Sequence, residues 1–251
     1  MKRKALIAAA LVLAAACAFA SGSEEEGPID SSGIQLIVIR SGPLDVRVSG
    51  GDSAEVSLDS EATPDFFSDN GSGPRVVHQR EGSRLNVWIE NDGLFPPTPS
   101  GQLLIQAPHG TDLIVETSTG RVFVDGVENG KCRVHSVSGR IRLRHVRGFL
   151  SVDSVSGIIE IDSAQGGVDA RTISGGIAGR KLRLTSDSSF SSVSGNIDIE
   201  LDSDLEDLGF DLKSVSGSIT VGSIRAERGL RMGFGRPLVR GHTISGALSF
   251  Q

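Results

Sequence analysis

Short stretches of this chain alternate apolar and polar residues. The alternation is clear at 44–48, at 56–58 and at 85–89. A period of two predicts β-strands that bury one face. Two polar or proline-rich stretches, 59–74 and 91–101, separate these strands and are typical of surface loops. No long stretch shows a helical period, so the pattern predicts an all-β protein.

The C-terminal half repeats a four-residue signature, Thr/Ser-x-Ser/Thr-Gly. Seven copies occur, and successive signature glycines are separated by 19, 18, 18, 20, 22 and 29 residues. A nearly fixed period close to twenty residues predicts stacked structural units. The signature glycines are Gly120, Gly139, Gly157, Gly175, Gly195, Gly217 and Gly246.

Alignment of the copies on the glycine gives aliphatic columns five and two positions before it, and two and four positions after it. We interpret all four columns as buried. The buried side of the chain then changes between the first two columns, which a flat strand cannot do, so each copy is expected to hold two strand segments joined by a bend. The column two before the glycine comprises Ser118, Val137, Val155, Ile173, Val193, Val215 and Ile244.

Stacking these copies with parallel pairing, about 4.8 Å apart, gives the predicted fold. It is a parallel β-solenoid, like a single-stranded β-helix, with coils of about 18–22 residues. The signature glycine marks either a position with no room for a side chain or a backbone bend with positive φ. The two longest spacings predict loops at 202–209 and 225–237 that protrude from one edge.

The first twenty residues have the anatomy of a secretory signal peptide. Lys2, Arg3 and Lys4 precede an apolar run, and Ala18-Phe19-Ala20 offers a small-x-small cleavage motif. Two processing routes remain open: cleavage after Ala20, or lipidation of Cys17 in a loose lipobox, which would tether the protein to a membrane. Both predict an exported protein, in the periplasm or at the cell surface.

The expected organisation has four parts. Residues 1–20 form the signal peptide, and the acidic, small-residue stretch 21–33 forms a flexible tether. Residues 34–108 form an N-terminal β region, either the first coils or a cap. Residues 109–251 form the seven-copy solenoid.

One known family has similar features. The stretch 103–113, Leu-Leu-Ile-Gln-Ala-Pro-His-Gly-Thr-Asp-Leu, leads into the seven signature copies. From about Leu36 to the C-terminus the chain resembles the bacterial "putative adhesin" family of β-strand-repeat proteins, a domain of unknown function. The resemblance implies a β-solenoid of the bacterial envelope, where some relatives are linked to stress responses, and it brings no catalytic residues.

A hydroxyl residue stands three positions before every signature glycine. Such a ladder would suit the binding of a glycan or an envelope protein. Alternatively, the stacked hydroxyls bond one another and the backbone of the turn. The ladder comprises Thr117, Ser136, Ser154, Thr172, Ser192, Ser214 and Thr243.

Charge and residue counts exclude several functions. A net charge of −6 leaves no basic footprint for nucleic acid. The five histidines lack paired metal-ligand spacing, the acidic stretch 202–207 is not an EF-hand, and we predict no metal or other cofactor. Cys132 falls in an aliphatic column and is predicted to be a core residue. Arg142 with Glu160, and Asp153 with Arg171, are expected to be neighbours across coils.

These observations favour a non-enzymatic exported protein of the cell envelope, with a binding or sensing role and an envelope protein or glycan as partner. One alternative is a polysaccharide-active β-helix enzyme. It would need acids or bases that converge on a groove, whereas the charged columns here are dispersed and aromatic residues make up 4% of the chain. A second alternative is a passive structural spacer.

Overall fold

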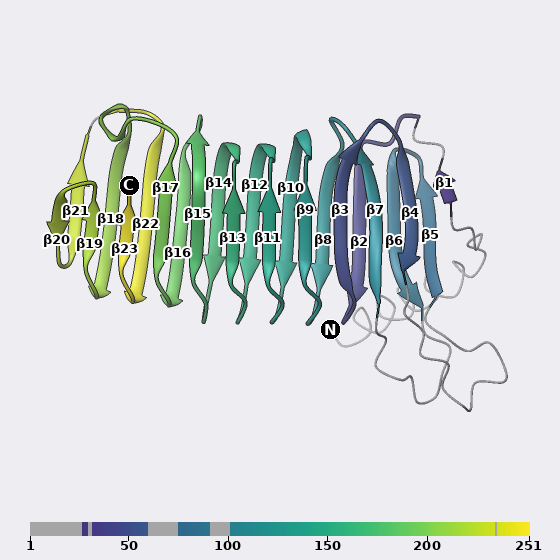
Figure 1. Ribbon diagram of the computed structural model, residues 1–251, viewed down its shortest axis with the longest axis horizontal. Coiled ribbons are helices and arrows are strands. Elements are labelled where there is room, and N and C mark those ends of the chain that lie inside the picture. The colour runs from purple at the N-terminus through teal and green to yellow at the C-terminus, as the bar shows by residue number, and fades with distance from the viewer. Residues whose placement is uncertain (1–26, 30–31, 60–74, 91–100, 234) are drawn as a thin grey trace, which may run out of the picture.

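The computed structural model describes residues 27–29, 32–59, 75–90, 101–233 and 235–251. These residues form one elongated stack of strands (Figure 1), and the helical structure among them is a single 3₁₀ turn at Leu205–Asp207. The predicted all-β, parallel solenoid class is confirmed. The signal peptide, Cys17 and most of the expected tether lie outside the described residues.

Each coil contributes one strand to each of two facing sheets. Sheet 1 holds the strand that leads into the signature, and sheet 2 holds the strand that follows it. In sheet 1 the strands are β8 (Asp112–Thr117), β10 (Glu128–Ser136), β12 (Arg147–Ser154), β14 (Gln165–Thr172), β16 (Ser188–Ser194), β18 (Gly209–Ser216) and β22 (Leu238–Ser245). In sheet 2 they are β9 (Val122–Asp125), β11 (Ile141–Arg144), β13 (Ile159–Asp162), β15 (Ile177–Leu184), β17 (Ile197–Leu201), β19 (Ile219–Val221) and β23 (Leu248–Phe250).

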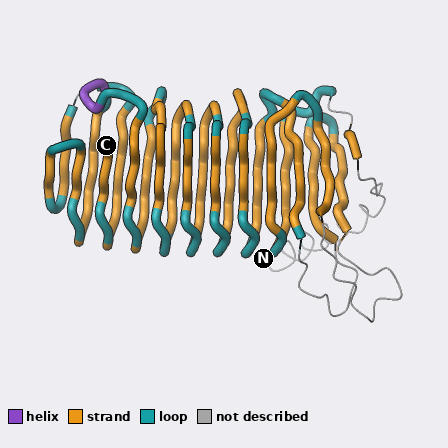
Figure 2. The backbone as a smooth tube through the Cα atoms, viewed as in Figure 1, coloured by secondary structure: helices purple, strands orange, loops and turns teal. Residues whose placement is uncertain are grey.

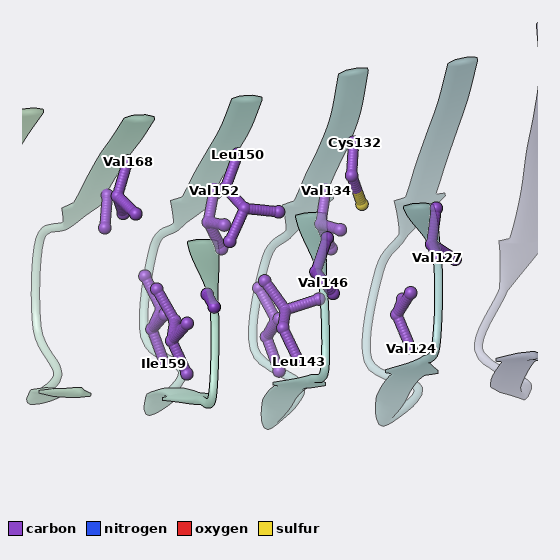
Figure 3. Packing of buried hydrophobic residues seen from close by; sticks show 14 of the residues in the cluster. Val124, Val127, Cys132, Val134, Leu143, Val146, Leu150, Val152, Ile159 and Val168 are labelled. Carbon is purple, nitrogen blue, oxygen red and sulfur yellow. The ribbon is translucent and has the colours of Figure 1, made fainter. Parts of the chain in front are cut away.

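Parallel pairing brings equivalent residues of successive coils together. Cys132 pairs with Leu113 and Leu150 in sheet 1, and Ile141 pairs with Val122 and Ile159 in sheet 2. Alternate side chains point between the sheets and form one continuous apolar core, part of which is seen in Figure 3. Three of the four predicted inward columns, those at five before and at two and four after the glycine, line this core.

The fourth column, two before the glycine, is exposed, so the prediction that it is buried is wrong. The last inward side chain of the sheet 1 strand belongs to the hydroxyl residue three positions before the glycine. The next inward side chain belongs to the residue two positions after the glycine. The chain turns the corner between these two positions. The predicted bend therefore exists, but it lies within the signature itself and directs the middle residue outward.

The N-terminal β region continues both sheets. Strands β2 (Leu36–Gly42) and β3 (Asp45–Gly51) form a coil that pairs in parallel with β8 and β9. On its other side this coil pairs in parallel with β6 (Arg84–Glu90) and β7 (Gln102–Pro108). The region 34–108 thus supplies further coils of the same stack.

Antiparallel strands close the N-terminal end. β5 (Arg75–Glu81) pairs with β6, and β4 (Ala54–Asp59) pairs with β7. β1 (Gly27–Ile29) pairs with β4 in turn. This part of the stretch expected to be a flexible tether is therefore a strand at the end of the stack.

The coil order is rearranged at the C-terminal end. β22 lies between β16 and β18, and β23 lies between β17 and β19, so the last coil in sequence is not the last in space. Beyond β18 and β19 lie the antiparallel strands β21 (Gly229–Met232) and β20 (Ile224–Ala226). The stretch 225–237 was expected to protrude as a loop, but most of it instead caps the stack (Figure 1).

Candidate functional site

The signature turns form a row along one long edge of the stack (Figure 2). The seven residues of the predicted hydroxyl ladder are all buried at this edge. The Ser136 and Ser154 hydroxyls accept hydrogen bonds from the backbone N–H of Gly139 and Gly157, at 3.0 and 2.8 Å. The Thr117 hydroxyl donates to the carbonyl of Gly42 at 2.8 Å.

Three further ladder hydroxyls bond to the backbone of a neighbouring coil. Ser192 donates to the carbonyl of Gly175 at 3.2 Å, and longer bonds join Thr172 to Gly157 and Ser214 to Gly246. Thr243 is likewise buried, but its hydroxyl oxygen has no hydrogen-bond partner. The ladder lines the inside of the corner and is out of reach of a partner molecule. Its geometry matches the second sequence interpretation, in which hydroxyls bond the turn backbone.

The signature glycines allow the coils to approach closely at the corner. A β-carbon on Gly139 would overlap the carbonyl oxygen of Gly120, and one on Gly157 would overlap that of Gly139. Neither glycine has a positive φ. At these positions the glycine is therefore explained by the lack of room for a side chain, and not by a backbone bend with positive φ.

The outer side of the same corner carries an exposed aliphatic column that sequence reasoning misplaced. Five of its side chains are between 41% and 66% exposed, and Val155 is partly buried. The backbone pairing places neighbouring members about 4.8 Å apart over six consecutive coils. We call this surface the corner column. In stack order it comprises Val137, Val155, Ile173, Val193, Ile244 and Val215.

The corner column has a polar margin. The residue after each column member is a serine, and the described serines at this position, such as Ser138, Ser156 and Ser174, are exposed. No charged residue interrupts the column. An apolar centre with a neutral polar edge is the arrangement found in protein–protein interfaces. Exposed apolar residues that form a continuous strip, unlike scattered ones, mark an interaction surface.

Other sequence candidates have structural explanations. Cys132 is a buried core residue as predicted, and burial raises the pKa of its thiol to about 12. Arg142 forms the expected ion pair with Glu160 across coils, at 2.7 Å. Asp153 and Arg171 are in register, but Arg171 bonds Asp169 on its own strand instead.

The described part of the chain contains neither a metal-ligand cluster nor a membrane-spanning helix. There, no three His, Cys, Asp or Glu side chains are grouped so that they could hold a metal ion. No helix in that part is long and apolar enough to cross a membrane.

The fold and the corner together define a class of protein: a parallel β-solenoid with serine–glycine corners and antiparallel caps. The chain belongs to the Toastrack DUF4097 family, a domain of unknown function, whose family model matches residues 98–231. This match confirms the family resemblance seen in the sequence.

One solved structure that is similar to this chain is that of a putative cell adhesion protein from Clostridium sporogenes. It shares 11% identity, with a TM-score of 0.40, and the match covers 92% of this chain and 99% of that one. The curated proteins contain no match to the chain.

Proposed function

We propose that the protein is a non-enzymatic, exported binding protein of the cell envelope that contacts an envelope protein through the corner column. The observation that carries the proposal is the continuous exposure of β-branched aliphatic side chains over six coils. A passive spacer would gain nothing from such a strip, because exposed apolar surface is unfavourable in water.

A protein partner fits the corner column better than a glycan does. The hydroxyls that would bond sugar groups are buried, and the column contains no aromatic ring on which a sugar could stack. Aliphatic side chains instead favour a partner that presents its own apolar side chains at a similar spacing. The exposed serines beside the column supply hydrogen bonds at the edge of such an interface.

The titratable groups support a non-enzymatic role. The hydrogen bond from Arg231 lowers the pKa of the Asp211 carboxyl. A general acid in a polysaccharide-cleaving enzyme needs the opposite shift. Several other carboxylates, among them Glu116, Glu160 and Asp169, form ion pairs that are spread over the outer faces of both sheets.

The role of the corner column in partner binding is tested by substituting its residues and chemically cross-linking the protein in envelope membranes. The triple variant Val137→Thr, Ile173→Thr and Val193→Thr keeps the β-branched shape and removes apolar surface. The control, Phe149→Thr with Ile224→Thr, changes exposed apolar residues outside the column. We expect wild type and control to cross-link to the same defined protein, and the triple variant to lose that product while keeping its β-sheet circular dichroism.

Equal cross-linking by all three proteins would contradict the role of the column. Release of reducing sugars from envelope polysaccharide by the purified protein would contradict the non-enzymatic proposal. Export is tested by mass spectrometry of the mature N-terminus. A chain that begins at Ser21 or at a lipidated Cys17 supports export, and an intact Met1 contradicts it.

A further inference from the structure

A second surface lies on the outer face of sheet 2, near the N-terminal end of the stack. It is a shallow hollow of about 780 Å³, formed where β3, β9 and β11 lie side by side. Five arginines and one carboxylate, Asp45, line it. The chain as a whole carries a net charge of −6, so this concentration of positive charge is local. The five arginines are Arg47, Arg121, Arg140, Arg142 and Arg144.

Strand register arranges these arginines in rows that cross the coils. Arg121 lies beside Arg140, and Phe123 lies between Arg47 and Arg142. Arg144 follows Arg142 two residues later on the same face of β11. Neighbouring positions in one row are about 4.8 Å apart, and successive rows on one strand are about 6.6 Å apart. The hollow thus presents guanidinium groups on a regular grid.

The arginines differ in how far their charge is already neutralised. Arg121 is held by Asp45 through its side chain and its backbone N–H, and Arg142 by Glu160 at 2.7 Å. Arg144 lies 3.9 Å from Asp162. In contrast, the Arg140 guanidinium has no hydrogen-bond or ion-pair partner among the described residues, whereas the Arg140 backbone carbonyl accepts a hydrogen bond from the N–H of Val122. The Arg47 guanidinium lies over the ring of Phe123, 4.7 Å from its centre, and no described carboxylate pairs with it.

From this arrangement we infer that the hollow binds an acidic glycan chain, through sugar carboxylates that pair with Arg47 and Arg140. Guanidinium groups bind planar carboxylates with two parallel hydrogen bonds, and the hollow already contains arginines paired to carboxylates. A glycan in which each sugar carries one carboxylate presents its negative charges at separated positions. This spacing matches Arg47 and Arg140, which lie on different strands of the hollow. This site is distinct from the corner column, which begins at Val137 in the coil of Arg140 and runs toward the C-terminal end.

Nucleic acid fits the hollow less well than an acidic glycan. Single strands bind by stacking bases on exposed aromatic faces, and Phe123, the one aromatic residue in the hollow, has a face covered by Arg47. Asp125, Glu160 and Asp162 border the hollow and neutralise part of its positive charge, which leaves too few free cations for the closely spaced phosphates of a long strand. The hollow therefore favours a ligand whose charges are sparse.

The test is calorimetric titration of the full-length purified protein with an oligogalacturonate, at low and at moderate salt. The variant is Arg47→Gln with Arg140→Gln. The control is Arg133→Gln with Lys131→Gln on β10, which makes the same charge change on the outer face of sheet 1. We expect the variant to bind about tenfold or more weakly than wild type, the control to lose much less, and binding to weaken as salt rises.

Three results would overturn the inference. The first is equal binding of the oligogalacturonate and a neutral malto-oligosaccharide. The second is an equal loss of affinity in the variant and the control, which would show a general charge effect. The third is equal or tighter binding of single-stranded DNA, also lost in the variant, which would assign the hollow to nucleic acid. Thermal unfolding of both variants checks that they fold.

Discussion

Gly175 lies against the backbone of the preceding coil so closely that a β-carbon on it would overlap the carbonyl oxygen of Gly157. The same contact recurs at the other signature glycines, from Gly120 to Gly246. The corner is therefore a place where backbone packs on backbone. The repeated glycine reflects this lack of space, and the adjacent buried hydroxyls bond the polar groups that the turn leaves unpaired.

The first prediction compares two adjacent glycines. Gly175→Ala should lower the free energy of unfolding by about 1–3 kcal/mol or more, because the added methyl group must push two coils apart. A β-carbon on Gly176 would meet the Asn196 carbonyl oxygen at 3.5 Å, which is ordinary contact. Gly176→Ala should therefore be tolerated. Denaturant unfolding of both variants measures the difference, and equal losses would contradict the close-packing explanation.

The second prediction concerns the buried hydroxyls. Ser136→Ala leaves the buried N–H of Gly139 without an acceptor and should cost about 1–3 kcal/mol of stability. Thr243→Val removes a hydroxyl that has no partner and should be neutral or stabilising. Ser138→Ala, at an exposed position, should change stability by no more than about 0.5 kcal/mol. A cost at Thr243 as large as that at Ser136 would refute this account of the ladder.

The third prediction concerns the inserted C-terminal coil. Phe250 of sheet 2 packs edge-on against Phe190 and Phe210 of sheet 1, with ring centres 6.0 and 5.7 Å apart. Phe250→Ala should cost about 3–5 kcal/mol, since it opens a cavity among fully buried rings. Phe149→Ala, at a 42% exposed position, serves as the control and should cost about 0.5 kcal/mol. Similar losses in both would argue against the insertion of the last coil.

The fourth prediction concerns Cys132. With its pKa raised to about 12 by burial, roughly one thiol in ten thousand is ionised at pH 8, so labelling by a thiol reagent should require unfolding. Rapid labelling of the folded protein would show that the thiol is accessible.

The same thiol gives stability a pH dependence. Between about pH 9 and pH 12 the unfolded chain loses a proton that the folded chain keeps, so rising pH lowers stability. Cys132→Val should remove this contribution, up to about 1.4 kcal/mol for each pH unit in that window. Denaturant unfolding at several pH values measures this difference. If the free energy of unfolding of wild type and of Cys132→Val changed equally with pH, the raised pKa of Cys132 would be contradicted.

The sequence predicted most of the stack because glycine fixes the register of every copy. Columns such as that of Val134 and Val152 are buried as expected. The prediction is wrong for the column of Val137 because a repeated aliphatic column by itself indicates an inward face. Periodicity shows that a residue repeats, but it does not show which side of a corner it occupies.

The coil formed by β2 and β3 escaped the repeat alignment for a different reason. Leu44 stands where the other copies have glycine, and Ser41 and Val46 occupy the hydroxyl and first inward positions. The coil order could not be predicted at all, since every coil presents similar columns to its neighbours. The corner column and the arginine hollow likewise depend on which strands lie side by side.

The place of β22 and β23 has a consequence for biosynthesis. β18 and β19 find their parallel partners only in β22 and β23, which follow them along the chain and leave the ribosome later. The C-terminal end of the stack therefore cannot be completed coil by coil as the polypeptide emerges. A chain truncated before residue 238 would lack β22 and β23, so β16 and β17 would each keep an unpaired edge. Such edges tend to pair with strand edges of other molecules.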